Sequence, residues 1–133
     1  MSDVDYDVFA EDYAVVRRPD PRIASAIWAA LGAARIVLNV GAGTGSYEPS
    51  DRDVTAVEPF AEMIAARPVD AAPAIQGSAE ALPFTDGSFD VAMAILSIHH
   101  WRDQDAGLAE MCRVAQRQVI LLVNAVSASL AGA

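Results

Sequence analysis

Cysteine and basic side chains are scarce in this sequence. Cys112 is the only cysteine among 133 residues, which excludes an internal disulfide and leaves no cysteine set for structural zinc. Nine lysine and arginine residues against 18 aspartate and glutamate residues give a formal net charge of −9. The basic residues form no patch, so this charge would repel a phosphate backbone. We therefore expect a protein of the reducing cytoplasm without a nucleic-acid partner.

Long apolar runs are also missing. No segment reaches the roughly 18 uninterrupted apolar residues that span a bilayer. Residues 1–7 are acidic and polar, whereas a secretion signal would be basic and then apolar. The hydrophobic content of 53% is ample for one core, and a chain of this length has room for one domain. The sequence thus predicts one soluble domain over residues 1–133, with no membrane partner.

Helical and extended patterns alternate along the chain. Asp20 and Pro21 are typical of a helix start, Ile23, Ile27 and Leu31 recur every four residues, and Gly32 is a typical helix end. These signals predict a helix over residues 21–31. Apolar runs predict strands at residues 35–40, 54–58, 73–77, 88–95 and 119–123, and spacing predicts helices within 61–67 and 103–116.

Such alternation predicts an α/β fold. We expect a Rossmann-like, doubly wound, mostly parallel sheet of about five strands, with helices on both faces and right-handed crossovers. Its ligand crevice should lie at the carboxyl ends of the strands. The stretch 46–53 is short and interrupted by Pro49, so any helix after the first strand must be brief or irregular.

A glycine-rich turn and an acidic residue mark that edge of the sheet. Gly41, Gly43 and Gly45 follow the first predicted strand, and bare backbone can turn sharply and approach a ligand closely. Alone the pattern is weak, because glycine turns also make plain strand-to-helix connections. Glu58 ends the next strand, where its carboxylate can lie beside the turn and accept hydrogen bonds from two ribose hydroxyls. Together they predict a pocket for an adenosine-containing cofactor.

Four ordered motifs carry a family resemblance. Residues 36–45, 57–59, 77–84 and 86–90 resemble the successive motifs of class I S-adenosylmethionine-dependent methyltransferases of the type 11, ubiquinone/menaquinone-biosynthesis-like group. Residues 6–13 and 17–19 resemble that group's leading segment, and the likeness reaches about Val123. It implies a single methyltransferase domain that takes S-adenosyl-L-methionine as cofactor. It also implies direct displacement of the methyl group onto a small-molecule acceptor.

The resemblance further implies, position by position, which residues bind the cofactor. Backbone of the glycine turn would contact the methionine part and Glu58 the ribose, while Leu96 and Ser97 would face the sulfonium. The implied set is Tyr13, Arg17, Gly41, Ala42, Gly43, Gly45, Glu58, Pro59, Met63, Ser78, Ala79 and Leu96. For Pro59, Met63 and Leu96, a plain role in the core or pocket wall is an equal alternative.

Two positions depart from the family pattern. Ser78 stands where the family commonly has an acid that reads the adenine amino group, and its hydroxyl can still accept a hydrogen bond. Asn39 also replaces a frequent acid, so its role can be to cap or orient the glycine turn.

Candidate catalytic residues follow the fourth predicted strand. His99 or His100 can act as a general base if the acceptor is a hydroxyl or amine, and the alternative is that they orient a loop or contact substrate. Adjacent histidines rarely point together and no third ligand has usable spacing, so we expect no metal site. Trp101 can form part of an acceptor wall.

The end of the chain leaves alternatives open. The resembled group continues past the fifth strand with a helix and an antiparallel strand pair, and the ten residues after Val123 cannot supply these, which implies a carboxy-terminally incomplete domain. Residues 119–123 would then form an apolar edge strand that can self-associate. A catalytically impaired cofactor-binding or interaction module is the first alternative. An NAD-dependent oxidoreductase is the second, although Ser46 replaces the sixth-position glycine of its motif.

Overall fold

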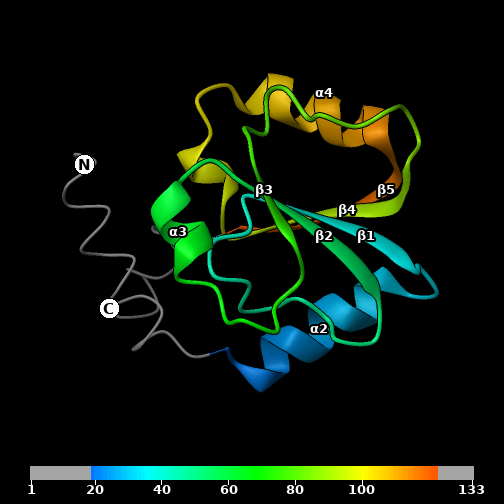
Figure 1. Ribbon diagram of the computed structural model, residues 1–133. Coiled ribbons are helices and arrows are strands. Elements are labelled where there is room, and N and C mark those ends of the chain that lie inside the picture. Colours follow the sequence, from blue (N-terminus) through cyan, green and yellow to red (C-terminus); the bar gives the residue numbers. More distant parts are fainter. Residues whose placement is uncertain (1–18, 123–133) are drawn as a thin grey trace, which may run out of the picture.

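A computed structural model describes residues 19–122 and shows a five-stranded sheet with helices on both faces (Figure 1). In chain order the elements are α2 (Pro21–Leu31), β1 (Ile36–Val40), β2 (Asp53–Glu58), α3 (Ala61–Ala65), β3 (Ala74–Gln76), β4 (Phe89–Ile95), the 3₁₀ turn η1 (Ile98–His100), α4 (Gln104–Val114) and β5 (Ala115–Leu121). The predicted fold class is confirmed.

The strands lie in the order β3-β2-β1-β4-β5, and every pair is parallel. Val37 of β1 is in register with Val54 of β2 on one side and Val91 of β4 on the other. From β1 the chain therefore adds β2 and β3 on one side of the sheet, and then returns to add β4 and β5 on the other. In sheets of this kind the crevice for a ligand lies at the carboxyl ends of the strands where the order reverses, here β1 and β4.

Side chains of β1 alternate between two hydrophobic clusters, one on each face of the sheet. Leu38 and Val40 belong to the cluster that contains Met111 and Val114 of α4. Val37 belongs to the other cluster, with Ile27 and Leu31 of α2. Figure 1 shows α4 and α2 on opposite sides of the sheet. Because successive strand residues point to opposite faces, a strand covered on both faces needs the unbroken apolar run found here.

Helix α2 has the bounds that its end signals predict. The Asp20 side chain accepts a hydrogen bond from the Arg22 backbone N–H at 2.9 Å, and Pro21 occupies the first turn. Gly32 has a φ of 59°, and its N–H donates to the Ala29 carbonyl at 3.1 Å. Between β1 and β2 the described residues form turns without a helix, as Pro49 predicts.

The fifth strand differs from its prediction. It begins at Ala115, directly after α4, rather than at residue 119. Its second to fourth residues, Gln116, Arg117 and Gln118, are polar, so the apolar run on which the prediction rests starts only at Val119. The Arg117 guanidinium donates to the carbonyls of Ala30 at 3.2 Å and Leu31 at 2.7 Å, in the last turn of α2, where carbonyls lack partners within the helix. The apolar pattern alone therefore placed the start of the strand too late.

Within the described residues β5 is an outer strand of the sheet, as expected for 119–123. Ile120 is 39% and Leu122 63% exposed. The last position of the predicted strand, the tail behind it, Tyr13 and Arg17 lie outside the described residues.

The core of β1 gives a stability prediction. Leu38 is fully buried, so Leu38→Ala should lower the free energy of unfolding by about 2–5 kcal/mol through lost burial and the cavity left behind. Val69 is fully exposed, and Val69→Ala should stay within about 0.5 kcal/mol of the parent. Urea denaturation measures both, and similar losses in the two variants would contradict this description of the core.

Candidate cofactor site

The glycine turn folds back onto the end of β2. The N–H groups of Gly41 and Ala42 both donate to the Val57 carbonyl, at 2.8 and 3.0 Å. Gly41, Gly43 and Gly45 have φ angles of 69°, 56° and 86°, a region that residues with a Cβ rarely adopt. A Cβ on Gly41 would lie 2.7 Å from the Ser97 Cβ, so the turn also packs closely against the end of β4.

Glu58 reaches the same turn from the end of β2. One carboxylate oxygen accepts the Gly43 N–H at 2.7 Å, and the other accepts the Phe60 N–H at 2.9 Å. The residue is only 3% exposed. Burial raises the pKa of the Glu58 carboxyl, whereas the two backbone hydrogen bonds and the charge of Arg67 act in the opposite direction. The bare-backbone turn and the acid that the sequence predicts to converge therefore do so.

A second buried charge holds the other side of the turn. The Arg67 guanidinium donates to Glu48 at 2.6 Å, to the Gly43 carbonyl at 3.2 Å and to the Ala72 carbonyl at 2.9 Å. The side chains of Arg67 and Glu48 are only 4% and 7% exposed. Asn39 donates its amide to the other Glu48 oxygen at 2.8 Å. If Asn39 orients the glycine turn, as the sequence suggests, it does so through its hydrogen bond to Glu48.

Neither Glu48 nor Arg67 was predicted from the sequence. They are 19 residues apart, and nothing in their spacing indicates a pair. The sequence holds one indirect signal, because residue 45 is a glycine and the Glu48 and Arg67 side chains meet beside it. A Cβ on Gly45 would lie 2.8 Å from a Glu48 oxygen and 3.0 Å from an Arg67 nitrogen.

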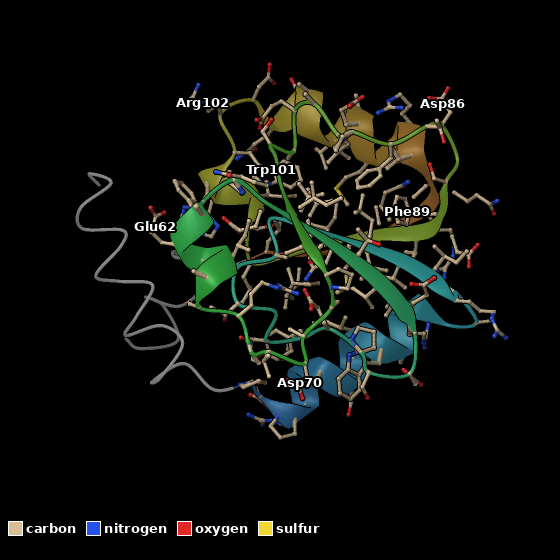
Figure 2. All side chains as sticks on the ribbon, viewed as in Figure 1. Glu62, Asp70, Asp86, Phe89, Trp101 and Arg102 are labelled. Atoms are coloured by element: carbon tan, nitrogen blue, oxygen red, sulfur yellow. The ribbon has the colours of Figure 1, made fainter. Side chains whose placement is uncertain are left out.

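The turn after β3 is held by α4. Glu110 accepts the Leu82 N–H at 2.8 Å, and Arg113 donates to the carbonyls of Leu82 and Phe84 at 2.9 and 2.8 Å. Arg113 also pairs with Asp86 at 2.9 Å, and Figure 2 shows Asp86 beside the end of α4. Helix α4 thereby positions the segment that begins with the buried Ala79.

These turns surround a cavity of about 480 Å³ at the carboxyl edge of the sheet. Ten of the predicted site residues line it: Gly41, Ala42, Gly43, Glu58, Pro59, Met63, Ser78, Ala79, Leu96 and His100. Gly45 and His99 are not among the lining residues. Gly45 packs instead against the Glu48 and Arg67 pair, and His99 is exposed.

Two further lining residues, Ser97 and Trp101, were expected beside the sulfonium and in the acceptor wall. The others were not in the predicted set: Asn39, Thr44, Ser46, Tyr47, Phe60, Glu80, Ile95 and Arg102. Most of them neighbour a predicted site residue in the chain, so their closeness to strand ends is the signal that could have found them. Trp28 and Asp20 bind Tyr47 on its outer side, through a 3.1 Å bond to its carbonyl and a 2.9 Å bond to its hydroxyl.

Leu96, directly after β4, has a left-handed backbone. Its φ is 59°, the one positive value among the described residues other than glycine. This conformation costs an L-residue about 1–2 kcal/mol. The Leu96 N–H donates to the Leu121 carbonyl at 2.8 Å, and the next residue, Ser97, donates its hydroxyl to the Val40 carbonyl at 3.0 Å. These bonds hold the strained turn against β5 and β1, where Leu96 faces the cavity.

The two histidines lie against each other at the rim. Their ring centroids are 4.0 Å apart, with the planes tilted by 42°. Partial burial lowers the pKa of His100, and the neighbouring His99 lowers it further. The His100 imidazole is therefore neutral, and able to accept a proton, over a wider pH range than an ordinary histidine.

A doubly wound parallel sheet, a glycine turn and a carboxylate that clamps it define a nucleotide-cofactor-binding α/β domain. Residues 38–123 match the family described as methyltransferase domain, and this match covers more than half of the chain. The chain belongs to this methyltransferase family, as its motifs predict.

Relatives and solved structures agree with this assignment. An uncharacterized methyltransferase of Mycobacterium tuberculosis is 38% identical over 95 residues, which cover 65% of this chain and 38% of that protein. A structure from Anabaena variabilis, described as a methyltransferase of an antibiotic biosynthesis pathway, has a TM-score of 0.69 at 35% identity, and the match covers 74% of this chain and 43% of that one.

An S-adenosylmethionine-dependent methyltransferase of Thermotoga maritima, described as a possible histamine N-methyltransferase, also has a TM-score of 0.69. It is 26% identical, and the match covers 83% of this chain and 53% of that one. The chain spans about two fifths of the length of the mycobacterial relative.

Residues 19–122 show neither a membrane-spanning helix nor a metal cluster. In that part of the chain no helix is long and apolar enough to cross a membrane. The same residues contain no group of three or more His, Cys, Asp or Glu side chains that could hold a metal ion.

The buried pair below the glycine turn gives a second prediction. Arg67→Ala should lower the free energy of unfolding by about 3–5 kcal/mol, because it leaves the Glu48 carboxylate buried without its partner. Arg22→Ala removes an arginine from an exposed pair and should leave stability unchanged within error. Chemical denaturation compares them, and equal stability of the two variants would show that the buried pair does not hold the turn.

His100 predicts a pH effect on stability. Since its pKa is lower in the folded than in the unfolded chain, its contribution is present above the ordinary histidine pKa and is lost as pH falls below it. Between pH 8 and 5.5 the parent protein should therefore lose more stability than His100→Gln. His99→Gln removes the smaller of the two causes that lower the pKa of His100, and should therefore keep most of the parent's loss of stability. If denaturation curves show that the parent and His100→Gln lose the same stability between these pH values, the lowered pKa of His100 is refuted.

Proposed function

We propose that the cavity binds S-adenosyl-L-methionine and that the domain transfers the methyl group to a small-molecule acceptor. The main support is the hydrogen bond between the Gly43 N–H and Glu58 on the cavity wall, in a chain of the methyltransferase family. The similar Thermotoga structure is described as that of an S-adenosylmethionine-dependent methyltransferase, which supports the choice of cofactor.

The residues present fit such a cofactor. Each Glu58 oxygen accepts one backbone N–H, and a carboxylate oxygen has room for a second donor. The carboxylate can therefore receive a pair of neighbouring hydroxyls, as on a ribose. A cavity of about 480 Å³ lies within the range of small-molecule sites. Pro59, Met63, Ser78 and Ala79 line its next stretch and would border the adenine.

When bound, S-adenosylmethionine supplies an electrophilic methyl group on a positively charged sulfur. The contribution of the protein is alignment, because displacement requires the acceptor to lie about 3–3.5 Å from the methyl carbon. Leu96, fixed by its bond to β5, forms the wall on the β4 side. His100 lines the rim with a neutral imidazole that can take the proton of a hydroxyl or amine acceptor. His99 does not line the cavity and is not proposed as the base.

Calorimetric titration with S-adenosylhomocysteine tests the cofactor, and labelled-methyl transfer to metabolite pools tests the reaction. Binding with turnover supports the enzyme, whereas binding without turnover supports the cofactor-binding module instead. A parallel titration with NADH covers the remaining alternative. Tight binding of NADH and none of S-adenosylhomocysteine would overturn the proposal.

Glu58→Gln sharpens the cofactor test. Glutamine removes the negative charge and turns an NH₂ group toward a backbone N–H that needs an acceptor. Affinity for S-adenosylhomocysteine should fall roughly 10- to 100-fold, the value of a hydrogen bond to a charged group. Glu62→Gln makes the same chemical change on the exposed side of α3 (Figure 2) and should leave affinity within twofold. Equal affinities in the two variants would remove Glu58 from the site.

A further inference from the structure

The indole N–H of Trp101 donates no hydrogen bond to any of the described residues. Trp101 follows η1 and, like its neighbour Arg102, lines the cavity (Figure 2). The indole Nε1 is buried and has no hydrogen-bond partner among the described residues. An indole N–H can only donate, and buried donors in folded proteins nearly always have an acceptor. This unpaired donor therefore points to an acceptor that residues 19–122 do not provide.

The indole ring packs directly against Gly107 of α4, a contact that we call its seat. A Cβ on Gly107 would lie 2.4 Å from Trp101 Cε3 and 2.6 Å from Cζ3, distances that a real side chain cannot adopt. Glycine inside a helix is less stable than alanine, because it loses more backbone freedom on folding. Helix α4 thus gives up local stability at the point where the Trp101 ring lies against it. The seat fixes the direction of the ring.

The other edge of the indole faces the cofactor half of the cavity. Nε1 lies 3.3 Å from the position that a Cβ of Gly41 would take. The Ala79 Cβ lies 3.3 Å from the corresponding position on Gly107. The indole therefore reaches from Gly107 of α4 to the glycine turn, and Gly107 itself lies beside Ala79, which lines the cavity.

We propose that Trp101 is a cofactor-binding residue whose indole N–H donates a hydrogen bond to an oxygen or ring-nitrogen acceptor of the bound nucleoside cofactor. This inference rests on the proposed function and adds a specific residue to it. Because the seat on Gly107 holds the ring in place beforehand, little rotamer freedom is lost on binding.

Trp101→Phe tests the donor, since it keeps an aromatic ring over Gly107 and removes the N–H. Affinity for S-adenosylhomocysteine, measured by calorimetry, should fall roughly three- to tenfold. Trp28→Phe is the matched control, because Trp28 is 41% exposed, does not line the cavity and donates to the Tyr47 carbonyl. It should bind within twofold of the parent. Circular dichroism and denaturation curves check that both variants are folded.

Fluorescence gives a readout that leaves Trp101 intact. In Trp28→Phe, Trp101 is the only tryptophan of the chain, and S-adenosylhomocysteine should change its emission saturably with the affinity found by calorimetry. Gly107→Ala should displace the ring from its seat and weaken binding, and adding Trp101→Phe should recover part of the lost folding stability.

The outcomes separate the two proposals. If the parent binds S-adenosylhomocysteine while Trp101→Phe binds equally well, or the Trp101 emission does not respond, the role of Trp101 is refuted and the proposed function stands. If the parent protein does not bind S-adenosylhomocysteine, the proposed function fails and this inference fails with it.

Discussion

The hydrogen bond from the Gly43 N–H to the Glu58 carboxylate joins the ends of two neighbouring parallel strands. It needs a backbone that only glycine adopts readily, since Gly43 has a positive φ and a Cβ there would lie 3.1 Å from the Met63 side chain. The hydrogen bond also needs the Glu58 carboxylate to stay charged, although this residue is only 3% exposed. Burial raises the pKa of Glu58, so every N–H or O–H that donates to the carboxylate helps to keep its charged form. A site of this kind favours a ligand with two adjacent hydroxyls.

The turn is held on its other side by a second charge. Arg67 binds the Gly43 carbonyl and Glu48 together, while Glu58 binds the Gly43 amide. One peptide unit on each side of a single glycine is thus tied to a buried ionic group. Both charges have their partners within the turn region, which is the condition for burying them without a large loss of stability. The result is a cradle whose shape is set before any ligand arrives, and preorganisation of this kind reduces the entropy lost on binding.

The fold gives this cradle but not the reaction partner. Parallel doubly wound sheets serve many chemistries, and what distinguishes them lies in the side chains at the strand ends. Here the distinguishing side chains come from the segment after β4, where Leu96, His100 and Trp101 face the cavity from one direction. The first is fixed by a strained backbone and the last by its seat on α4. This segment is therefore where the proposed roles of His100 toward the acceptor and of Trp101 toward the cofactor would meet.

The sequence by itself determined the order of strands and helices, the bounds of α2, the glycine turn and the acid beside it. Those features depend on local periodicity, on end signals such as Asp20 and Gly32, and on the rule that parallel strands end at one edge. Only the tertiary structure decided that Gly45 packs against a buried ion pair, that His100 rather than His99 lines the cavity, and that the Trp101 ring packs against Gly107. It also decided that β5 begins at Ala115, ahead of the apolar run, and that Arg117 binds the end of a helix 86 residues away. Each of these depends on which side chains from distant segments meet, and no local pattern encodes such a meeting.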